Sequence, residues 1–181
     1  WRKTPGMEHL TVNVNVSAKQ LTYSGFIDEV RDALHRSGLE PEALKLEITE
    51  TVLMENPEFA TFILQRLKDL GLRLSVDDFG TGYSSLSYLQ RFPVDTLKVD
   101  QSFVTKMGGS QENQEIVKAV IALAHSLGLD VVAEGVEAND QCQLLTEMRC
   151  ESGQGYLFSR PMDCDRVAGF LSDNCSDFKR F

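Results

Sequence analysis

The sequence lacks the residue patterns of several functional classes. Its four cysteines show no Cys-x-x-Cys spacing, which argues against a redox motif and favours reduced thiols in a cytoplasmic protein. Its three histidines lie far apart, with no second histidine or cysteine at ligand spacing, so no zinc site is expected. Its most apolar stretch, Ile116 to Ala133, is interrupted by Lys118, His125 and Asp130, so it does not predict a membrane span.

Positive charge is also scarce. Lysine and arginine total 18 against 27 acidic residues, for a net charge of -9. Because affinity for nucleic-acid backbones depends on lysine and arginine, a nucleic-acid polymer is not an expected partner. No linker, repeat or low-complexity segment interrupts the chain, so residues 1–181 are predicted to form a single domain.

Strand-like and helix-like runs alternate along the chain, which is the signature of βα units. Six strands are predicted, at 10–16, 44–48, 73–77, 96–99, 130–133 and 155–158. The predicted helices are 25–37 with Ser24 as N-cap, one from the Asn56 cap to Gly71, 84–91, 112–127, 140–148 and 165–172. Six units suggest a TIM-type (β/α)8 barrel that lacks two strands, which we expect before Trp1. A complete doubly wound parallel sheet is the alternative.

Polar side chains recur at the ends of these strands. They are Asn15, Glu47, Asp77, Asp78, Lys98, Asp100 and Glu134. In a parallel barrel all strand C-termini open on one face, so these residues should converge there. Carboxylates, one amide and one lysine suit divalent metals and phosphate chemistry.

Asp77-Asp78-Phe79-Gly80 is part of the most specific stretch. Two consecutive aspartates repel each other unless a cation lies between them, and one of them can bridge two metals. A solvated Asp-Asp turn is the alternative interpretation. Glu47, at the end of the preceding strand, is a candidate third ligand.

The remaining strand-end residues have competing interpretations as well. Asn15 stands among β-branched residues, where its amide needs partners that a metal would supply. Lys98, between apolar neighbours, needs an anionic partner: it either assists phosphate chemistry, held by Asp100, or forms a structural ion pair with Asp100 or another carboxylate. Glu134 or Glu137 could act as a general base.

Two further candidate residues, Glu50 and Gln154, lie outside the central cluster. Glu50, expected in the loop after the second strand, could bond backbone amides of a neighbouring loop or cap a helix. Gln154 could bond a base edge or a phosphate, although a lone glutamine is weak evidence.

Several segments that contain these residues, taken in their order along the chain, resemble the EAL domain family of bacterial cyclic di-GMP phosphodiesterases. The segments that carry the resemblance are Val14-Asn15-Val16-Ser17-Ala18-Lys19-Gln20-Leu21, Leu46-Glu47-Ile48-Thr49-Glu50, Asp77 to Leu86, Leu97-Lys98-Val99-Asp100 with Phe103-Val104, Ala133-Glu134-Gly135-Val136-Glu137, and Gln154-Gly155-Tyr156-Leu157-Phe158-Ser159-Arg160-Pro161. The resemblance implies a modified (β/α)8 barrel with one antiparallel strand. It also implies opening of one phosphodiester of cyclic di-GMP to give linear pGpG.

The resemblance assigns a role to each candidate residue. Two Mg²⁺ or Mn²⁺ ions would be bound by Asn15, Glu47, Asp77 and Asp78. Lys98 would contact the nucleophilic water, and Glu134 would be the candidate general base. Asp100, Glu137 and Gln154 would bind the substrate. Glu50 would brace the loop from Asp78 to Leu86, which in this family couples dimerisation to activity.

One family feature is missing. The Glu-Ala-Leu segment that gives the family its name, with its metal-binding glutamate, would precede Trp1 and is distinct from the tripeptide Glu42-Ala43-Leu44 of this sequence, so we expect an EAL-type domain truncated at its N-terminus. The alternative function is a cyclic di-GMP receptor that does not hydrolyse its ligand; an interaction scaffold is a weaker possibility. The expected partners are a second copy in a homodimer and fused sensory or diguanylate cyclase modules upstream.

Overall fold

Six strands form one curved parallel sheet in the part of the chain that the structure describes. The structure, a computed structural model, describes residues 1–4, 6–82 and 85–174. Its strands are β1 (Val12–Asn15), β2 (Leu44–Thr49), β3 (Arg73–Phe79), β4 (Thr96–Val99), β5 (Asp130–Glu134) and β6 (Ser152–Gln154). They are neighbours in sequential order, and every pairing is parallel. A doubly wound sheet would reverse its strand order, so the predicted incomplete barrel is confirmed.

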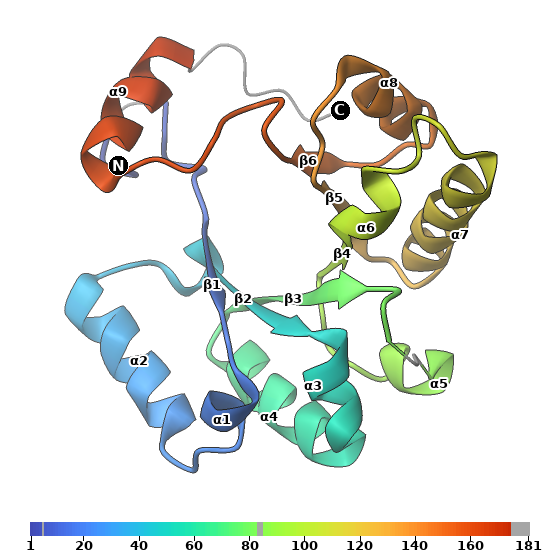
Figure 1. Ribbon diagram of the computed structural model, residues 1–181. Coiled ribbons are helices and arrows are strands. Elements are labelled where there is room, and N and C mark those ends of the chain that lie inside the picture. The colour runs from blue at the N-terminus through green and yellow to red at the C-terminus, as the bar shows by residue number, and fades with distance from the viewer. Residues whose placement is uncertain (5, 83–84, 175–181) are drawn as a thin grey trace.

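Helices line the outside of this sheet. They are α1 (Ala18–Leu21), α2 (Phe26–Ser37), α3 (Glu50–Glu55), α4 (Pro57–Asp69), α5 (Leu86–Leu89), α6 (Gln101–Val104), α7 (Gln111–Ser126), α8 (Asn139–Glu147) and α9 (Cys164–Asn174), with a 3₁₀ turn at Pro41–Ala43. The strands curve around a centre that is open on the side between β1 and α9 (Figure 1). Within the described residues, no helix combines the length and apolarity needed to cross a bilayer.

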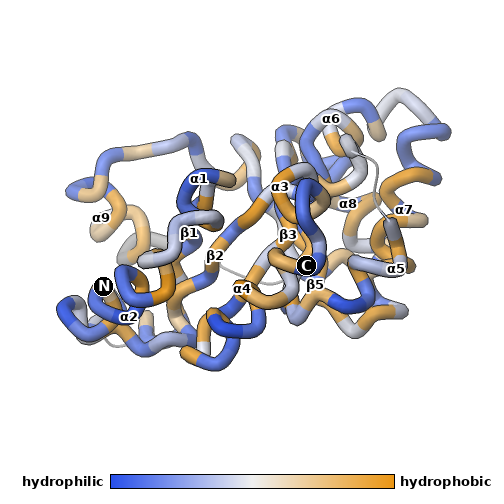
Figure 2. The backbone as a smooth tube through the Cα atoms, turned by 90° about the horizontal axis from the view of Figure 1, so that it is seen from below, coloured by the Kyte–Doolittle hydropathy of each residue, from blue (hydrophilic) through white to orange (hydrophobic). Residues whose placement is uncertain are grey.

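The two faces of the sheet differ in polarity. Leu46, Leu74 and Leu97 point outward, where each is at most 3% exposed beneath the helices. Glu47, Ser75 and Lys98 alternate with them and point inward, because successive strand residues face opposite sides. In Figure 2 the hydrophobic colouring follows parts of β2 and α4, whereas hydrophilic stretches lie in peripheral loops. The polar residues Glu47, Ser75 and Lys98 of the strands thus lie on the inside of the curve.

Helix boundaries follow the capping signals only in part. Asn56 caps α4 as predicted, accepting a hydrogen bond from the Phe59 N–H at 3.2 Å. The prediction that Ser24 caps α2 was wrong, because Gly25 occupies the N-cap position without a side-chain bond. The short helices α1, α3 and α6 were not predicted, since each is only four to six residues long. The predicted helix start at Ser84 lies outside the described residues.

The sixth strand was placed wrongly. Residues 155–158 were predicted to be extended, but β6 is Ser152–Gln154 and the chain turns directly after it. The Phe158 and Ser159 N–H groups both donate to the Gly155 carbonyl, at 3.1 and 3.3 Å. The apolar residues after Gly155 have the composition of a strand, whereas β6 itself consists of Ser152, Gly153 and Gln154. Gln154 therefore lies within β6 rather than before it.

Candidate functional site

The ammonium group of Lys98 lies at the centre of the inner face. Its Nζ is 2.7 Å from Glu47 Oε2, 2.8 Å from Asp77 Oδ1 and 2.6 Å from Glu134 Oε1. These partners come from β2, β3 and β5, so one side chain on β4 joins four strands. Among the described residues Lys98 forms no ion pair with Asp100, so the prediction that Asp100 holds it was wrong. Its ion pairs are with the other site carboxylates, Glu47, Asp77 and Glu134.

A bulge in β3 brings both aspartates to the inner face. Val76 pairs with Leu97 and Phe79 pairs with Val99, so Asp77 and Asp78 together stand opposite Lys98 alone. Asp78 has a φ of 53°, a left-handed conformation that is uncommon for a residue other than glycine. A regular strand would send consecutive side chains to opposite faces, whereas the extra residue of a bulge redirects one of them. The adjacent aspartates thereby share one site.

Negative charge exceeds positive charge at this site. Four carboxylates, those of Glu47, Asp77, Asp78 and Glu134, surround the one ammonium of Lys98. Burial, followed by the charges of Asp77 and Asp100, raises the pKa of Asp78. Burial also raises the pKa of Glu134, and the nearby Lys98 opposes it. The ionised carboxylates therefore need further positive charge for full stabilisation.

Lys98 itself stays charged. Burial is the largest influence on its pKa and lowers it, but the contacts with Asp77, Glu134 and Glu47 outweigh burial. The pKa of Lys98 is therefore raised above its usual value. A lysine that holds its proton this firmly is suited to stabilising negative charge rather than to accepting a proton.

The donor atoms fit a divalent cation. One carboxylate oxygen each from Asp77, Asp78 and Glu134 lies within 4.8 Å of the other two. Asp77 Oδ1 is buried and has no hydrogen bond, since the Lys98 ammonium lies close to it but outside hydrogen-bond geometry. Hard oxygen ligands and a buried oxygen without a hydrogen bond are features of Mg²⁺ and Mn²⁺ sites.

Two asparagines, Asn13 and Asn15, lie on β1 beside the strand that carries Glu47. Asn15 is exposed, because β1 pairs only with β2 in the described sheet. It is nevertheless paired with Glu47 in the sheet register. Asn13, two residues earlier on the same face, donates from Nδ2 to Glu47 Oε1 at 2.6 Å. Sequence reasoning missed Asn13, although its spacing of two from Asn15 was a usable signal.

The predicted substrate-binding residues lie around the rim. Asp100 caps α6 by accepting from the Ser102 N–H at 2.9 Å, so it has a structural role at least. Gln154 is paired with Glu134 in the register of β5 and β6 and is exposed. Glu137 is also exposed, in the loop after β5. Their positions leave Glu137 and Gln154 accessible to a ligand.

Glu50 joins the end of β2 to the loop after β3. It is the first residue of α3 rather than a loop residue, and it is 1% exposed. Its Oε2 accepts from the Gly80 N–H at 2.8 Å. The contact with a neighbouring loop was expected, and it connects Glu50 to the segment that begins with Asp77 and Asp78. Tyr83, within that same segment, lies outside the described residues.

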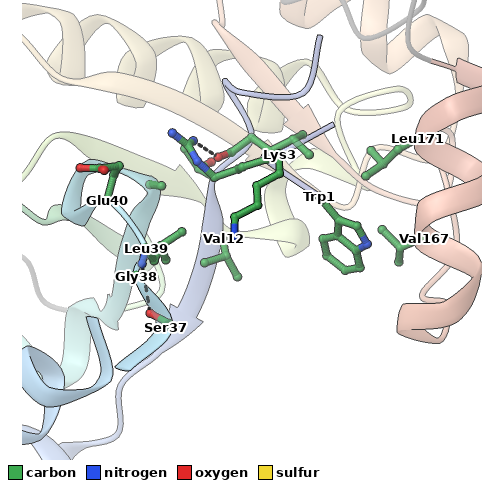
Figure 3. Close-up of a pocket in the computed structure, with 13 residues that line it drawn as sticks. Trp1, Lys3, Val12, Ser37, Gly38, Leu39, Glu40, Val167 and Leu171 are labelled. Carbon is green, nitrogen blue, oxygen red and sulfur yellow. Dashed lines mark hydrogen bonds between the residues drawn. The ribbon is translucent and has the colours of Figure 1, made fainter. Parts of the chain in front are cut away.

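A separate cavity lies at the open side of the barrel. It has a volume of about 570 Å³ and is lined mainly by the N-terminal segment, residues 37–40 and α9. Trp1, Val12, Val167 and Leu171 are among its apolar lining residues (Figure 3). None of the predicted site residues lines it, so it is not the candidate active site.

Comparison with known proteins relates the chain to one family. The EAL domain family matches residues 1–161. The cyclic di-GMP phosphodiesterase NbdA of Pseudomonas aeruginosa is 51% identical over 166 residues, which are 92% of this chain and 21% of NbdA. The chain therefore spans about a fifth of that relative's length.

Solved structures agree with this relation. The PaMucR phosphodiesterase in complex with c-di-GMP has a TM-score of 0.84 and 43% identity, over 87% of this chain and 64% of that chain. The manganese and cyclic di-GMP complex of BlrP1 from Klebsiella pneumoniae has a TM-score of 0.77 and 35% identity, over 83% of this chain and 39% of that chain.

Proposed function

Because the chain belongs to the EAL domain family, we propose that its parent protein is a metal-dependent phosphodiesterase that hydrolyses cyclic di-GMP to linear pGpG. The observation that carries the proposal is the convergence of Glu47, Asp77, Asp78 and Glu134 around Lys98. Relatives named as cyclic di-GMP phosphodiesterases, and a related structure with that ligand, support the choice of substrate.

Two divalent ions, Mg²⁺ or Mn²⁺, belong to the proposal. Asp77, Asp78, Glu47 and Asn15 would hold them. The excess of carboxylates and the buried Asp77 oxygen without a hydrogen bond support this assignment. When bound, such ions activate water and neutralise charge on a phosphoryl group.

The protein residues would transfer the proton, stabilise the developing charge and position the substrate. Glu134 would take a proton from the attacking water as the water oxygen bonds to phosphorus and one phosphodiester P–O bond breaks. Lys98 would hold its positive charge beside the phosphoryl oxygens, where negative charge increases in the transition state. Asp100, Glu137 and Gln154 would position the nucleotide, and Glu50 would hold the loop that follows Asp78.

The test is conversion of cyclic di-GMP to pGpG by the full-length protein, followed chromatographically with Mg²⁺ or Mn²⁺. Glu134→Gln should lower kcat by roughly 10²- to 10⁴-fold, the usual contribution of a general base. Glu147→Gln is the matched control, because Glu147 is exposed on α8 and should leave the rate unchanged. A near-normal rate in Glu134→Gln would exclude the role assigned to that residue.

The same experiment separates the enzyme from the receptor. Tight binding of cyclic di-GMP by the unsubstituted protein without any turnover would make it a non-hydrolysing receptor. Absence of both nucleotide and metal binding in calorimetry would instead revive the scaffold hypothesis. Metal-dependent production of pGpG would establish the enzyme.

The proposal extends to the assembly. Fused modules upstream, sensory or diguanylate cyclase, are part of the proposal, since NbdA is about five times as long as the chain and the 44% identical relative MucR is named as a bifunctional diguanylate cyclase and cyclic di-GMP phosphodiesterase. A cytoplasmic location and a homodimer complete the proposal. Analytical ultracentrifugation of the full-length protein would test the homodimer, and a sedimentation coefficient of a monomer at every concentration would contradict it.

A further inference from the structure

Gln141 is a buried amide behind the candidate site. It is 6% exposed, and among residues 1–4, 6–82 and 85–171, whose burial the structure describes, it is the only buried asparagine or glutamine. It lies in the first turn of α8, on the side of the loop that follows β5. A buried amide is costly unless its donor and acceptor atoms are both satisfied, so its partners indicate what holds it there.

The carbonyl group of Gln141 holds the loop that carries Glu137. Gln141 Oε1 accepts from the Glu137 N–H at 2.8 Å and from the Ala138 N–H at 3.0 Å. Ala138 is the N-cap residue of α8 and has no side-chain oxygen with which to cap the helix. Gln141 therefore supplies the acceptor for these two loop amides.

The amino group of the same side chain reaches a different βα segment. Gln141 Nε2 donates to the carbonyl oxygens of Val104 and Thr105, at 3.2 and 3.4 Å. These carbonyls end α6, the helix that Asp100 caps directly after β4. One amide thus joins the segment after β4 to the segment after β5.

Close backbone packing reinforces this junction. Gly135 has a φ of +70°, and a Cβ atom there would lie 2.7 Å from Gln101 Cβ, at the start of α6. On the other side, the Val136 N–H donates to the Gln154 carbonyl at 3.0 Å. The loop from Gly135 to Ala138 is therefore held between α6 and β6, and Gln141 is its side-chain anchor.

We propose that Gln141 is a positioning residue that places Glu137 for recognition of the cyclic dinucleotide. The inference rests on the proposed function, since Glu137 is a substrate-binding residue only in that context. Glu134 lies on β5 and is held by its own contact with Lys98. Loss of the Gln141 anchor should consequently disturb binding of the substrate more than the chemical step.

The test compares KM and kcat in the full-length protein. Gln141→Met removes both the acceptor and the donor at similar side-chain length. KM for cyclic di-GMP should rise roughly 10- to 100-fold, the usual effect of removing a residue that orients a site, while kcat changes less than about threefold. Gln143→Met is the matched control: Gln143 is exposed on the same helix, where it bonds Glu147, and its KM should not change.

Separate measurement of KM and kcat distinguishes a role of Gln141 in positioning Glu137 from a role in the stability of the fold. A substitution that merely unfolds a share of the molecules lowers apparent kcat and leaves KM unchanged, because the folded remainder binds as before. Gln141→Glu provides a second variant if Gln141→Met does not fold. It keeps the acceptor for the loop amides but loses the donor to α6, so KM should rise by a smaller factor.

Each outcome is decisive. An active unsubstituted protein whose KM is unchanged in Gln141→Met, or in Gln141→Glu if the first variant does not fold, would overturn this inference alone. An unsubstituted protein without turnover would overturn the proposed function and this inference together. A raised KM with near-normal kcat would support both.

Discussion

At the scale of single residues, Lys98 is a buried charged side chain that depends on its carboxylate partners. It is 3% exposed and lies within 3 Å of three carboxylates. Burying an ammonium group alone is very unfavourable, and burying several carboxylates without a cation is equally so. The lysine and its partners are therefore mutually dependent, and substitution of Lys98 should affect stability as well as activity.

Lys98→Met should lower the free energy of unfolding by about 3–5 kcal/mol without divalent cations, because the remaining carboxylates lose their counter-charge. The loss should shrink as the pH falls, because burial raises the pKa of Asp78 and of Glu134 and their protonated forms no longer repel the neighbouring carboxylates, and it should also shrink with added Mg²⁺. Urea unfolding across pH and Mg²⁺ concentration measures this. Lys68→Met is the control: the Lys68 to Asp95 pair is 29% and 36% exposed and should contribute about 0–1 kcal/mol. Equal losses of unfolding free energy in Lys98→Met and Lys68→Met would contradict the prediction that the buried Lys98 contributes more than the exposed ion pair.

A second prediction concerns the cysteines. Burial raises the pKa of the Cys150 thiol to about 11, so only a small fraction is thiolate at neutral pH, and the side chain is 2% exposed. Cys164 on α9 is exposed. Because thiolate and access control alkylation, iodoacetamide should modify Cys164 in the native protein and leave Cys150 intact until the protein unfolds. Peptide mapping that finds equal native rates would refute this.

At the scale of elements, the contact between β6 and the loop after β5 depends on one glycine. A Cβ atom at Gly155 would lie 2.1 Å from the Val136 carbonyl oxygen and 2.3 Å from its nitrogen. Both are backbone atoms that bond the segment of Gln154 to Leu157. They cannot move away without breaking the pairing that holds Gln154 beside Glu134.

Gly155→Ala should therefore destabilise the protein by at least about 1–3 kcal/mol, the range for overpacking, and should weaken ligand binding through Gln154. Gly169→Ala is the matched substitution, since Gly169 lies exposed in α9 with nothing within 4 Å of the added atom. It should stabilise the helix by up to about 1 kcal/mol. Thermal unfolding measures both, and a neutral Gly155→Ala would show that the loop can shift.

At the scale of the whole molecule, the described sheet is an open half-barrel. β1 pairs only with β2, and Val12 and Val14 on it are 46% and 44% exposed. An edge strand with exposed apolar side chains is a template for pairing with another chain. The open side also carries the apolar cavity beside Trp1 and α9.

The isolated chain of residues 1–181 should therefore associate with itself as its concentration rises. Val14→Lys should shift it toward the monomer, because a charged side chain on an edge strand opposes pairing. Ala119→Lys adds the same charge at an exposed position on α7 and should not. Sedimentation velocity over a concentration series measures the effect. A monomer at all concentrations would contradict the prediction.

The sequence by itself determined the series of βα units and most of their boundaries. Periodicity and caps are local, so β4 was predicted at its observed limits and α4 at its observed start. The strand-end residues Glu47, Asp77, Asp78, Lys98 and Glu134 were also identified, because parallel strands place their ends on one face.

Only the tertiary structure decided how these residues meet. The bulge that turns Asp77 and Asp78 to one face, the choice of three carboxylates rather than Asp100 as partners of Lys98, and the place of β6 all depend on contacts across strands. The same holds for Gln141, whose four partners lie on two segments, one of them more than 30 residues away in sequence. Local sequence patterns do not predict such contacts, because strand register and the distances between side chains are fixed only when the strands pack together.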